Sequence, residues 1–388
     1  MRALPGIVCL AFLFSCFATK APAQEVVPSP QDTQRVSKEL SPEDPAMAEE
    51  LARLGRFYQE RFADAPEAAK AQLNALQRKA AAENWTFQPA YTAVFGRDIS
   101  KLTGLKVPPN VQEIAKRQNE FAEEARSALK LGAAPICDPA AKKFNLRSIN
   151  KVSPVVDQGM CGSCWAFTSV AVYEANYLIR GNGRMPNASE QHVLDCSLDL
   201  VNNAPAGSCE GGWYDSVFNW WMTTPVTNRR TAPYEGAKSP SCRFRNGEYL
   251  SLVWGYVDPD HWSQDNFSPP IESMKKAICE HGAIAVAVNA SEEWTYYGGG
   301  VYNIDVPGDL NHAVTLVGWD DDLGAWLIKN SWSRAWGDRG FMWIKYGTSR
   351  IGAVPAWVEV NLQRPSAELN RVMSRYKDIF GDKPASEQ

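Results

Sequence analysis

Residues 157–167 read Asp-Gln-Gly-Met-Cys-Gly-Ser-Cys-Trp-Ala-Phe, and this stretch carries more of the fold and chemistry than any other. Its glycines permit a tight backbone path, and Cys164 falls where an apolar helix over residues 164–180 is predicted to begin. A helix N-terminus favours negative charge, so this position stabilises a thiolate, the reactive form of cysteine. Gln158 stands six residues earlier, and its amide with the Cys164 backbone N–H would form an oxyanion hole. The stretch therefore predicts a nucleophilic cysteine.

A cysteine nucleophile needs a base and a group that orients the base. The chain has four histidines, and His312 stands at the edge of a predicted strand. Asn330 follows in a Lys-Asn-Ser-Trp run, and its neutral amide can accept a hydrogen bond from the imidazole without adding charge. The competing interpretations are a buried core histidine for His312 and a structural thiol or half-cystine for Cys164. The motif around each residue favours the chemical interpretation.

The N-terminus has the pattern of a secretory signal peptide over residues 1–23. Arg2 precedes an apolar stretch over residues 7–14, and Ala-Pro-Ala at 21–23 supplies small residues at a cleavage-like spacing. Lipidation at Cys16 is the alternative, and bulky Phe14 disfavours it. We expect a secreted or periplasmic protein, or one in a lysosome-like compartment of a eukaryotic host.

The number of cysteines also indicates an oxidising compartment outside the cytosol. Nine cysteines less Cys9 and Cys16 leave an odd number, which predicts three disulfides and one reactive thiol, although some could be simple buried thiols. A Cys-Cys-His metal site at Cys161 and Cys164 lacks a second ligand pair, so we expect no metal and no organic cofactor. A net charge of −4 gives no argument for nucleic acid or membrane partners and leaves the oligomeric state open.

The rest of the chain divides into segments that differ in composition and in hydrophobic periodicity. Residues 24–46 are rich in Pro, Ser and Gln and look like a linker. Helical periodicity follows in three segments: one with Met47, Leu51, Leu54, Phe57 and Phe62 on one stripe, one over residues 66–82, and one from Val111 to near Gly132. An extended stretch is expected over 84–95. Short apolar runs at 283–288, 313–317, 325–328 and 341–344 predict antiparallel strands, and hence an α+β fold. The tail predicts one amphipathic helix over 369–380.

Together these motifs resemble the papain family of cysteine peptidases across roughly residues 140–360. The resemblance implies a two-lobed fold, with a helical lobe that carries Cys164 and a β-rich lobe that carries His312 and Asn330. It implies Cys164 as nucleophile, His312 as base, Asn330 as orienter and Gln158 as oxyanion donor. Trp332 and Trp336 match the family's two indoles, and Trp332 would shield the Asn330–His312 hydrogen bond from water.

The resemblance also implies the substrate-binding residues. Residues 209–212 match the family's Cys-x-Gly-Gly, whose glycines let an extended substrate pair with the backbone. An apolar pocket for the side chain two positions before the cut is expected to be closed by Ala356 and to prefer Leu, Val, Phe or Tyr. The full substrate-binding set is Gly211, Gly212, Trp213, Tyr214, Ala287, Asn311, Ala313, Trp332 and Ala356.

The resemblance pairs Cys161 with Cys209 and Cys196 with Cys242, which leaves Cys137 and Cys279 for each other outside the family pattern. The sequence departs from the family in two further places. Residues 144–147 read Phe-Asn-Leu-Arg where Asp-Trp-Arg is usual, and His192 stands where an aliphatic residue is usual.

The expected organisation has four parts: a signal peptide (1–23), an inhibitory helical prosegment (24–134), a peptidase domain (135–362) and a helical tail (363–388). The expected activity is that of a cysteine endopeptidase, made as a zymogen, that acts on polypeptides through a thioester acyl-enzyme. Its own prosegment is the expected inhibitor. The alternatives are a ligase or transpeptidase that uses the same residues, and a non-catalytic binding protein on a papain scaffold. For the helical segment, the alternative is an accessory domain that stays attached.

Overall fold

A nine-stranded sheet forms the centre of the fold, in a computed structural model. The structure describes residues 45–132, 134–181, 184–200, 203–244, 246–360, 362, 367, 371–372 and 374–375. The expected signal peptide, almost all of the linker and most of the expected tail helix lie outside these residues. No helix among the described residues combines the length and the apolar character needed to cross a bilayer.

The sheet has the strand order β1-β7-β10-β9-β8-β6-β11-β5, with β2 paired to β8. Its pairs are antiparallel except for β7 and β10, which run parallel. A second sheet has the two short strands β3 and β4. The strands are β1 (Phe87–Pro89), β2 (Lys143–Asn145), β3 (Gly207–Ser208), β4 (Gly211–Gly212), β5 (Ser251–Tyr256), β6 (Ile284–Val288), β7 (Tyr297–Tyr302), β8 (His312–Asp320), β9 (Ala325–Lys329), β10 (Phe341–Lys345) and β11 (Ala353–Val360).

Helices surround this sheet, and the expected α+β class is confirmed. The central helix α6 packs against β8 and β11, and thirteen of its seventeen residues are buried, as its apolar sequence predicted. The helices are α2 (Pro45–Ala63), α3 (Glu67–Ala82), α4 (Ile99–Leu102), α5 (Val111–Ala128), α6 (Cys164–Arg180), α7 (Glu190–Cys196), α8 (Tyr214–Trp221) and α9 (Ile271–His281). Single 3₁₀ turns lie at η1 (Pro259–His261), η2 (Glu292–Tyr296) and η3 (Thr348–Arg350).

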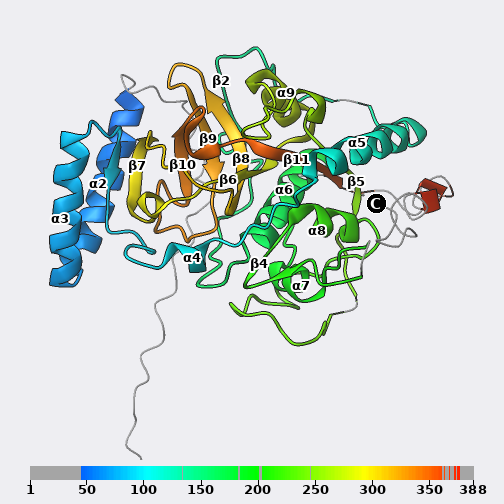
Figure 1. The fold of residues 1–388 in the computed structure, drawn as a ribbon, viewed down its shortest axis with the longest axis horizontal. Coiled ribbons are helices and arrows are strands. Elements are labelled where there is room, and N and C mark those ends of the chain that lie inside the picture. The colour runs from blue at the N-terminus through cyan, green and yellow to red at the C-terminus, as the bar shows by residue number, and fades with distance from the viewer. Residues whose placement is uncertain are drawn as a thin grey trace, which may run out of the picture. The chain divides into compact units, whose positions relative to one another are not determined.

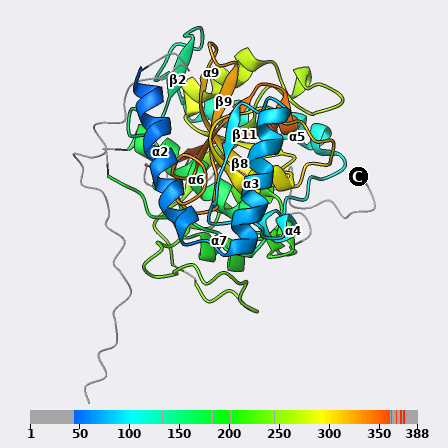
Figure 2. The same cartoon turned by 90° about the vertical axis from the view of Figure 1, so that its left-hand side faces the viewer.

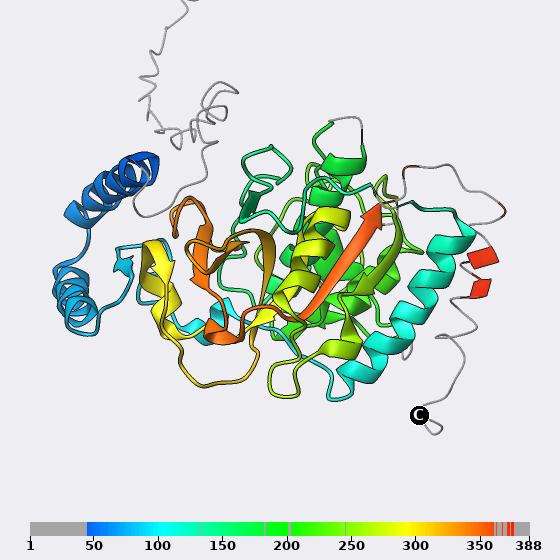
Figure 3. The ribbon, with the colours of Figure 1, turned by 90° about the horizontal axis from the view of Figure 1, so that it is seen from above.

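The N-terminal region (residues 45–128) reaches both edges of the large sheet. Helices α2 and α3 lie on the side of β7, where β1 adds an antiparallel strand to the edge (Figures 1 and 2). Helix α5 packs against β5, the strand at the opposite edge, and Figure 3 shows it at the other end of the molecule from α2 and α3. Helix α4 and the chain after it connect the two ends (Figure 1).

Two expectations for this region need correction. The stripe on α2 holds at Leu54 and fails at Phe57, which is exposed, while the next residue, Tyr58, is buried. The Tyr58 hydroxyl donates to the carbonyl of Gly337 at 2.8 Å, a tertiary contact that the sequence did not predict. The third long helix ends at Ala128 instead of near Gly132.

Candidate active site

Cys164 is the first residue of α6, and its thiol is fully buried. Backbone N–H groups of Ala313, Trp165 and Gly104 face the sulfur and favour its negative form, as the helix N-terminus does. Burial works against them and is the larger effect, since it raises the pKa of the thiol to about 12. Burial thus favours the neutral thiol in this structure, and Gly104, a residue of the N-terminal region, lies against the sulfur.

His312 begins β8, and Asn330 directly follows the last residue of the neighbouring strand β9. Imidazole Nε2 lies 2.9 Å from Asn330 Oδ1, so Nε2 carries the proton and donates it to the amide oxygen. Nδ1 is buried and finds no hydrogen-bond partner within the described part of the chain. Burial lowers the pKa of His312 to about 4. The ring is therefore neutral, with Nδ1 free to accept a proton.

Three indoles enclose the imidazole. The ring centroids of Trp332 and His312 are 4.9 Å apart, and Trp294 approaches the imidazole edge-on at 6.3 Å. Trp336 packs against Trp332 and donates from Nε1 to the carbonyl of Trp294 at 2.6 Å. All three indoles are buried, so they exclude water from the His312–Asn330 hydrogen bond. The sequence predicted two of them, but Trp294 lies in η2 and belongs to no recognised motif.

The Gln158 side chain is fixed from both ends of its amide. Oε1 accepts a hydrogen bond from the Ser331 hydroxyl at 2.6 Å. Nε2 donates to the carbonyl of Cys161 at 2.8 Å and to the carbonyl of Leu102 at 3.0 Å. The Trp332 indole N–H donates to the same Leu102 oxygen at 3.2 Å. Two donors thus converge on one peptide carbonyl, as an oxyanion hole would do.

That carbonyl belongs to residues 102–106, which we call the covering segment. Gly104 N and Leu105 N donate to the carbonyl of Asn311 at 2.9 and 2.8 Å. On the other side, Gly212 N donates to the carbonyl of Gly104, and Lys106 N donates to the carbonyl of Gly212, which makes a parallel bridge between Leu105 and Gly212. The covering segment therefore lies between Gly212 and Asn311, over the Cys164 thiol.

Close backbone approach at the covering segment requires glycine. A Cβ on Gly104 would lie 2.2 Å from the carbonyl oxygen of Gly162, and a Cβ on Gly211 would lie 2.6 Å from the carbonyl oxygen of Gly104. Gly211 also has a φ of +118°, which L-residues rarely adopt. The glycines of the 209–212 motif thus let an extended chain lie against β4, as the sequence predicted for a substrate.

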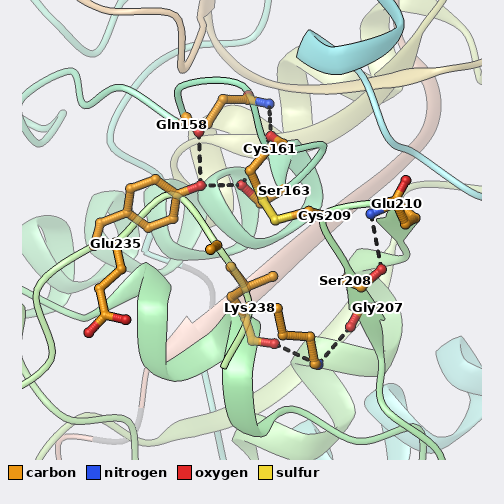
Figure 4. Close-up of a disulfide and its surroundings, with 12 residues drawn as sticks. Gln158, Cys161, Ser163, Gly207, Ser208, Cys209, Glu210, Glu235 and Lys238 are labelled. Carbon is orange, nitrogen blue, oxygen red and sulfur yellow. Dashed lines mark hydrogen bonds between the residues drawn. A yellow bond between two sulfur atoms is a disulfide. The ribbon is translucent and has the colours of Figure 1, made fainter. Parts of the chain in front are cut away.

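A disulfide holds β3 and β4 against residues 158–163, the loop that precedes Cys164 (Figure 4). Cys161 is bonded to Cys209, and Gly162 N donates to the carbonyl of Cys209 at 2.9 Å. Figure 4 also shows the Gln158 amide beside Cys161, and Lys238 bound to the carbonyl of Gly207 at 2.8 Å. The disulfide and the hydrogen bond from Gly162 to Cys209 therefore fix the loop before Cys164 relative to strands β3 and β4.

The predicted pocket alanines lie on one face of the large sheet. Ala313 pairs with Ala287, and Ala356 pairs with Ala285 two residues away, so their side chains share a face. Tyr256, opposite Ala356, reaches across to Asp215 of α8 at 2.9 Å. This face is therefore directed toward α8.

The predicted Trp213 and Tyr214 lie where that face meets α8. Their rings stack at 4.1 Å, and the Tyr214 hydroxyl donates to the carbonyl of Val354 in β11. Burial raises the pKa of the neighbouring Asp215 to about 6. No sequence signal identified Asp215, because it reaches this face of the sheet only through the packing of α8 against the strands. Asn311 contributes through its backbone, while its side chain binds Ala290.

The structure has disulfides between Cys137 and Cys279, Cys161 and Cys209, and Cys196 and Cys242, the pairs expected above. Cys164 is the free thiol among the described cysteines. His192 lies near the Cys196–Cys242 bond, which makes this the one described cluster with metal-ligand spacing. Both of its sulfurs are already bonded to each other, and His192 Nδ1 accepts from Thr227 N at 3.0 Å. His192 is therefore a buried structural residue, and burial lowers its pKa to about 4.

Solved structures share this architecture. Digestive procathepsin L 3 from Tenebrio molitor larval midgut superposes with a TM-score of 0.57 at 25% identity, over 82% of this chain and 94% of that one. Digestive procathepsin L2 of the same organism gives a TM-score of 0.60 at 24% identity, over 79% and 94%, which supports the fold alone.

Sequence relatives point the same way. Cathepsin L of Sarcophaga peregrina is 35% identical over 208 residues, which are 52% of this chain and 58% of the relative. Digestive cysteine proteinase 3 of Homarus americanus is 33% identical over 210 residues, 53% of this chain and 61% of the relative. The chain thus matches less than two thirds of the length of these relatives. A family model described as papain family cysteine protease matches residues 140–357, more than half of the sequence. The chain belongs to the papain family of cysteine proteases.

Proposed function

We propose that this chain is a cysteine endopeptidase, made as an inactive precursor, with Cys164 as nucleophile and His312 as its acid–base partner. One observation carries the proposal above the others. A peptide carbonyl, that of Leu102, is already held by Gln158 Nε2 and Trp332 Nε1, and Gly104 of the same segment faces the Cys164 thiol. A site that receives a peptide carbonyl on two donors beside a nucleophile suits attack on a peptide bond.

The reaction follows from the groups in place. His312 Nδ1 accepts the thiol proton, and the thiolate adds to the carbonyl carbon of the substrate. Gln158 and the Cys164 backbone N–H stabilise the oxyanion. His312 returns the proton to the leaving amine, the C–N bond breaks, and a thioester remains. Water, deprotonated by the imidazole, then adds to the thioester and releases the acid. Asn330 holds the ring throughout by accepting from Nε2.

The N-terminal region acts as the inhibitor in this proposal, within the prosegment of residues 24–134. Its covering segment occupies the site and lies against the Cys164 sulfur through Gly104. The likeness to the procathepsin L 3 structure extends over 82% of the chain, which is more than the 140–357 match covers, and this supports a precursor. Residues 135–362 then form the peptidase domain, and residues 363–388 form a C-terminal tail.

An apolar preference two positions before the cut belongs to the same proposal. Leu105 is buried between Gly212 and Asn311, which supports a pocket for an aliphatic side chain at this place. The pocket walls assigned from the sequence are aromatic or alanine, and a buried guanidinium would find no counterion on the alanines. The disulfides fit export, to the periplasm, the exterior or a lysosome-like compartment.

The test is a comparison of the processed wild-type protein with Cys164→Ala on a fluorogenic peptide. Ala is a good helix former and fits at the start of α6, so we expect loss of activity with an unchanged melting temperature. Substantial hydrolysis by Cys164→Ala would refute the mechanism. Product analysis with an added amine nucleophile separates a hydrolase from a transpeptidase, because a transpeptidase joins the acyl group to the amine.

A further inference from the structure

We propose that maturation cuts the Lys106–Val107 bond and that helix α5 stays in the mature enzyme as a permanent cover of the sheet edge. This inference rests on the proposed function, because it takes the covering segment to be the inhibitor. It narrows the removable region to the part before residue 107. The cut is a hydrolysis: water adds, the Lys106–Val107 amide breaks, and a new carboxylate and a new amine form.

Helix α5 satisfies backbone groups of the edge strand β5. Asn119 Nδ2 donates to the carbonyl of Tyr256 at 2.8 Å, and Asn119 Oδ1 accepts from Tyr256 N at 2.7 Å. Gln118 Nε2 donates to the carbonyl of Trp254 at 2.8 Å. Trp254 and Tyr256 are two residues apart and point their backbone groups to the same side of the strand, away from β11. The two side-chain amides therefore satisfy backbone groups of this edge that a further strand would otherwise pair with.

The contact is also apolar and close. Apart from Gln118, the buried residues of α5 are apolar: Val111, Ala115, Phe121, Ala122 and Ala125. Gly255 makes the approach possible, since a Cβ there would lie 3.0 Å from Asn119 Oδ1 and 2.7 Å from the Trp357 ring. Loss of α5 would expose this apolar face and an unpaired strand edge, which invites aggregation.

A buried charge on the main sheet depends on α5 as well. Glu359 of β11 is buried and is paired with Arg126 of α5. Its other neighbour, His281 Nδ1 at 3.1 Å, belongs to a ring that burial holds neutral, and that ring stacks on Trp357 at 4.0 Å. Removal of Arg126 would leave the Glu359 carboxylate buried without its cation, which is a costly arrangement.

Unlike α5, which stabilises the sheet, the covering segment must leave the site before substrate can bind. Between it and α5 lie Val107, Pro108, Pro109 and Asn110, of which Pro109 and Asn110 are exposed, as is Lys106 before them. Two prolines in a short exposed connection resist helix and strand formation, so this connection separates the two segments. A cut after Lys106 also puts Leu105 two positions before the scissile bond, where the proposed pocket prefers an apolar side chain.

The cut is made by a second, active molecule. In this structure the carbonyl held by Gln158 belongs to Leu102, four residues before the Lys106 carbonyl. The Lys106–Val107 bond therefore lies away from the molecule's own thiol. The bond between Cys137 and Cys279 keeps the chain after α5 attached to α9.

The experiment begins with the full chain, activated and then labelled with an epoxide that alkylates reactive cysteines. Intact mass and N-terminal sequencing define the labelled form. We expect it to begin between residues 107 and 111. The same preparation is made from Asn119→Ala and from Glu120→Ala, whose side chain is exposed on the same helix. The processed Asn119→Ala enzyme should melt several degrees below wild type, and the processed Glu120→Ala enzyme should match wild type.

An active, labelled enzyme that begins at residue 112 or later, within α5 or beyond it, would overturn the inference. So would equal melting temperatures for all three processed enzymes, because a helix that has been removed cannot affect stability. Failure of any processed form to react with the epoxide or cleave peptides would instead overturn the proposed function, whatever the N-terminus. Sequencing of the wild-type enzyme decides the question even where the Asn119→Ala precursor does not fold.

Discussion

Gln158 donates from Nε2 to the carbonyl oxygen of Leu102 at 3.0 Å, so a peptide group of the chain's own N-terminal region lies on the amide proposed to stabilise the oxyanion. The Ser331 hydroxyl donates to Oε1 of the same amide and fixes which end points toward the carbonyl. In the proposed mechanism, inhibition and catalysis therefore use the same donor. The covering segment would block the enzyme by occupying the Gln158 amide that the substrate carbonyl needs.

Gln158→Ala in the processed enzyme should lower kcat by roughly 10²-fold, the usual effect of losing one oxyanion donor. Ser331→Ala should give a smaller loss in kcat with little change in KM, because it frees the amide to rotate without removing it. Steady-state kinetics on one peptide substrate measure both. A Gln158→Ala enzyme with normal kcat and a raised KM would assign Gln158 to ground-state binding.

Acid should loosen the covering segment. Burial lowers the pKa of His312 to about 4, whereas a hydrated imidazole titrates near 6.5. If release of the covering segment lets water reach the ring, the covered form keeps its full stability above pH 6.5 and loses stability relative to the uncovered form as the pH falls from 6.5 toward 4. The loss is at most on the order of 3 kcal/mol, because Trp294 and Trp332 still pack on the ring after release. Acid would then help to activate the precursor.

Hydrogen exchange of residues 102–106 in the uncleavable Cys164→Ala precursor measures this effect. Protection factors should fall as the pH is lowered within the window, by at most about tenfold for each pH unit, which is the limit for one proton. The Cys164→Ala/His312→Ala precursor is the control and should show little dependence. Equal pH dependence in the two precursors would show that a group other than His312 controls release.

The residues of the candidate site were easier to recognise in the sequence than the segment that covers them. Cys164, Gln158 and His312 stand in local motifs whose residue types the reaction requires, and the strands around them showed clear apolar runs. The covering segment has no such signal, because it is short and its contacts with Gly212 and Asn311 are made by backbone atoms. On α2 the sequence did not distinguish Tyr58 from its neighbour Phe57, because the hydrogen bond of Tyr58 goes to the carbonyl of Gly337, 279 residues away.

The Cys137–Cys279 bond should contribute strongly to stability. It joins residues 142 apart in sequence, and a long closed loop restricts the unfolded chain. Cys137→Ser/Cys279→Ser should lower the free energy of unfolding by roughly 2–4 kcal/mol. Denaturant unfolding measures this, with Lys276→Ala on the exposed side of α9 as a control expected to stay within about 0.5 kcal/mol of wild type. A double variant as stable as the control would mean that the bond adds little to the packing of α9.

The preference for the side chain two positions before the cut should depend on the alanines of the proposed pocket. The processed enzyme should cleave a Phe-Arg fluorogenic substrate over an Arg-Arg substrate by at least about tenfold in kcat/KM, or about 1.4 kcal/mol. Phe stabilises the complex by burial, whereas Arg would leave a buried charge without a partner. Ala356→Glu should supply that partner and raise the relative cleavage of Arg-Arg by tenfold or more.

Asp215 is the residue that can contradict this expectation, because it is an acidic side chain on α8 near the same sheet face. Its Oδ2 accepts from the Tyr256 hydroxyl, and burial raises its pKa to about 6, so the carboxylate is already bound within the wall. We therefore expect Asp215→Asn to leave the Phe-Arg to Arg-Arg ratio unchanged. Efficient cleavage of Arg-Arg by wild type that disappears in Asp215→Asn would show that this carboxylate turns into the pocket to meet a guanidinium. In that case the alanines would shape the pocket, while Asp215 would determine its charge preference.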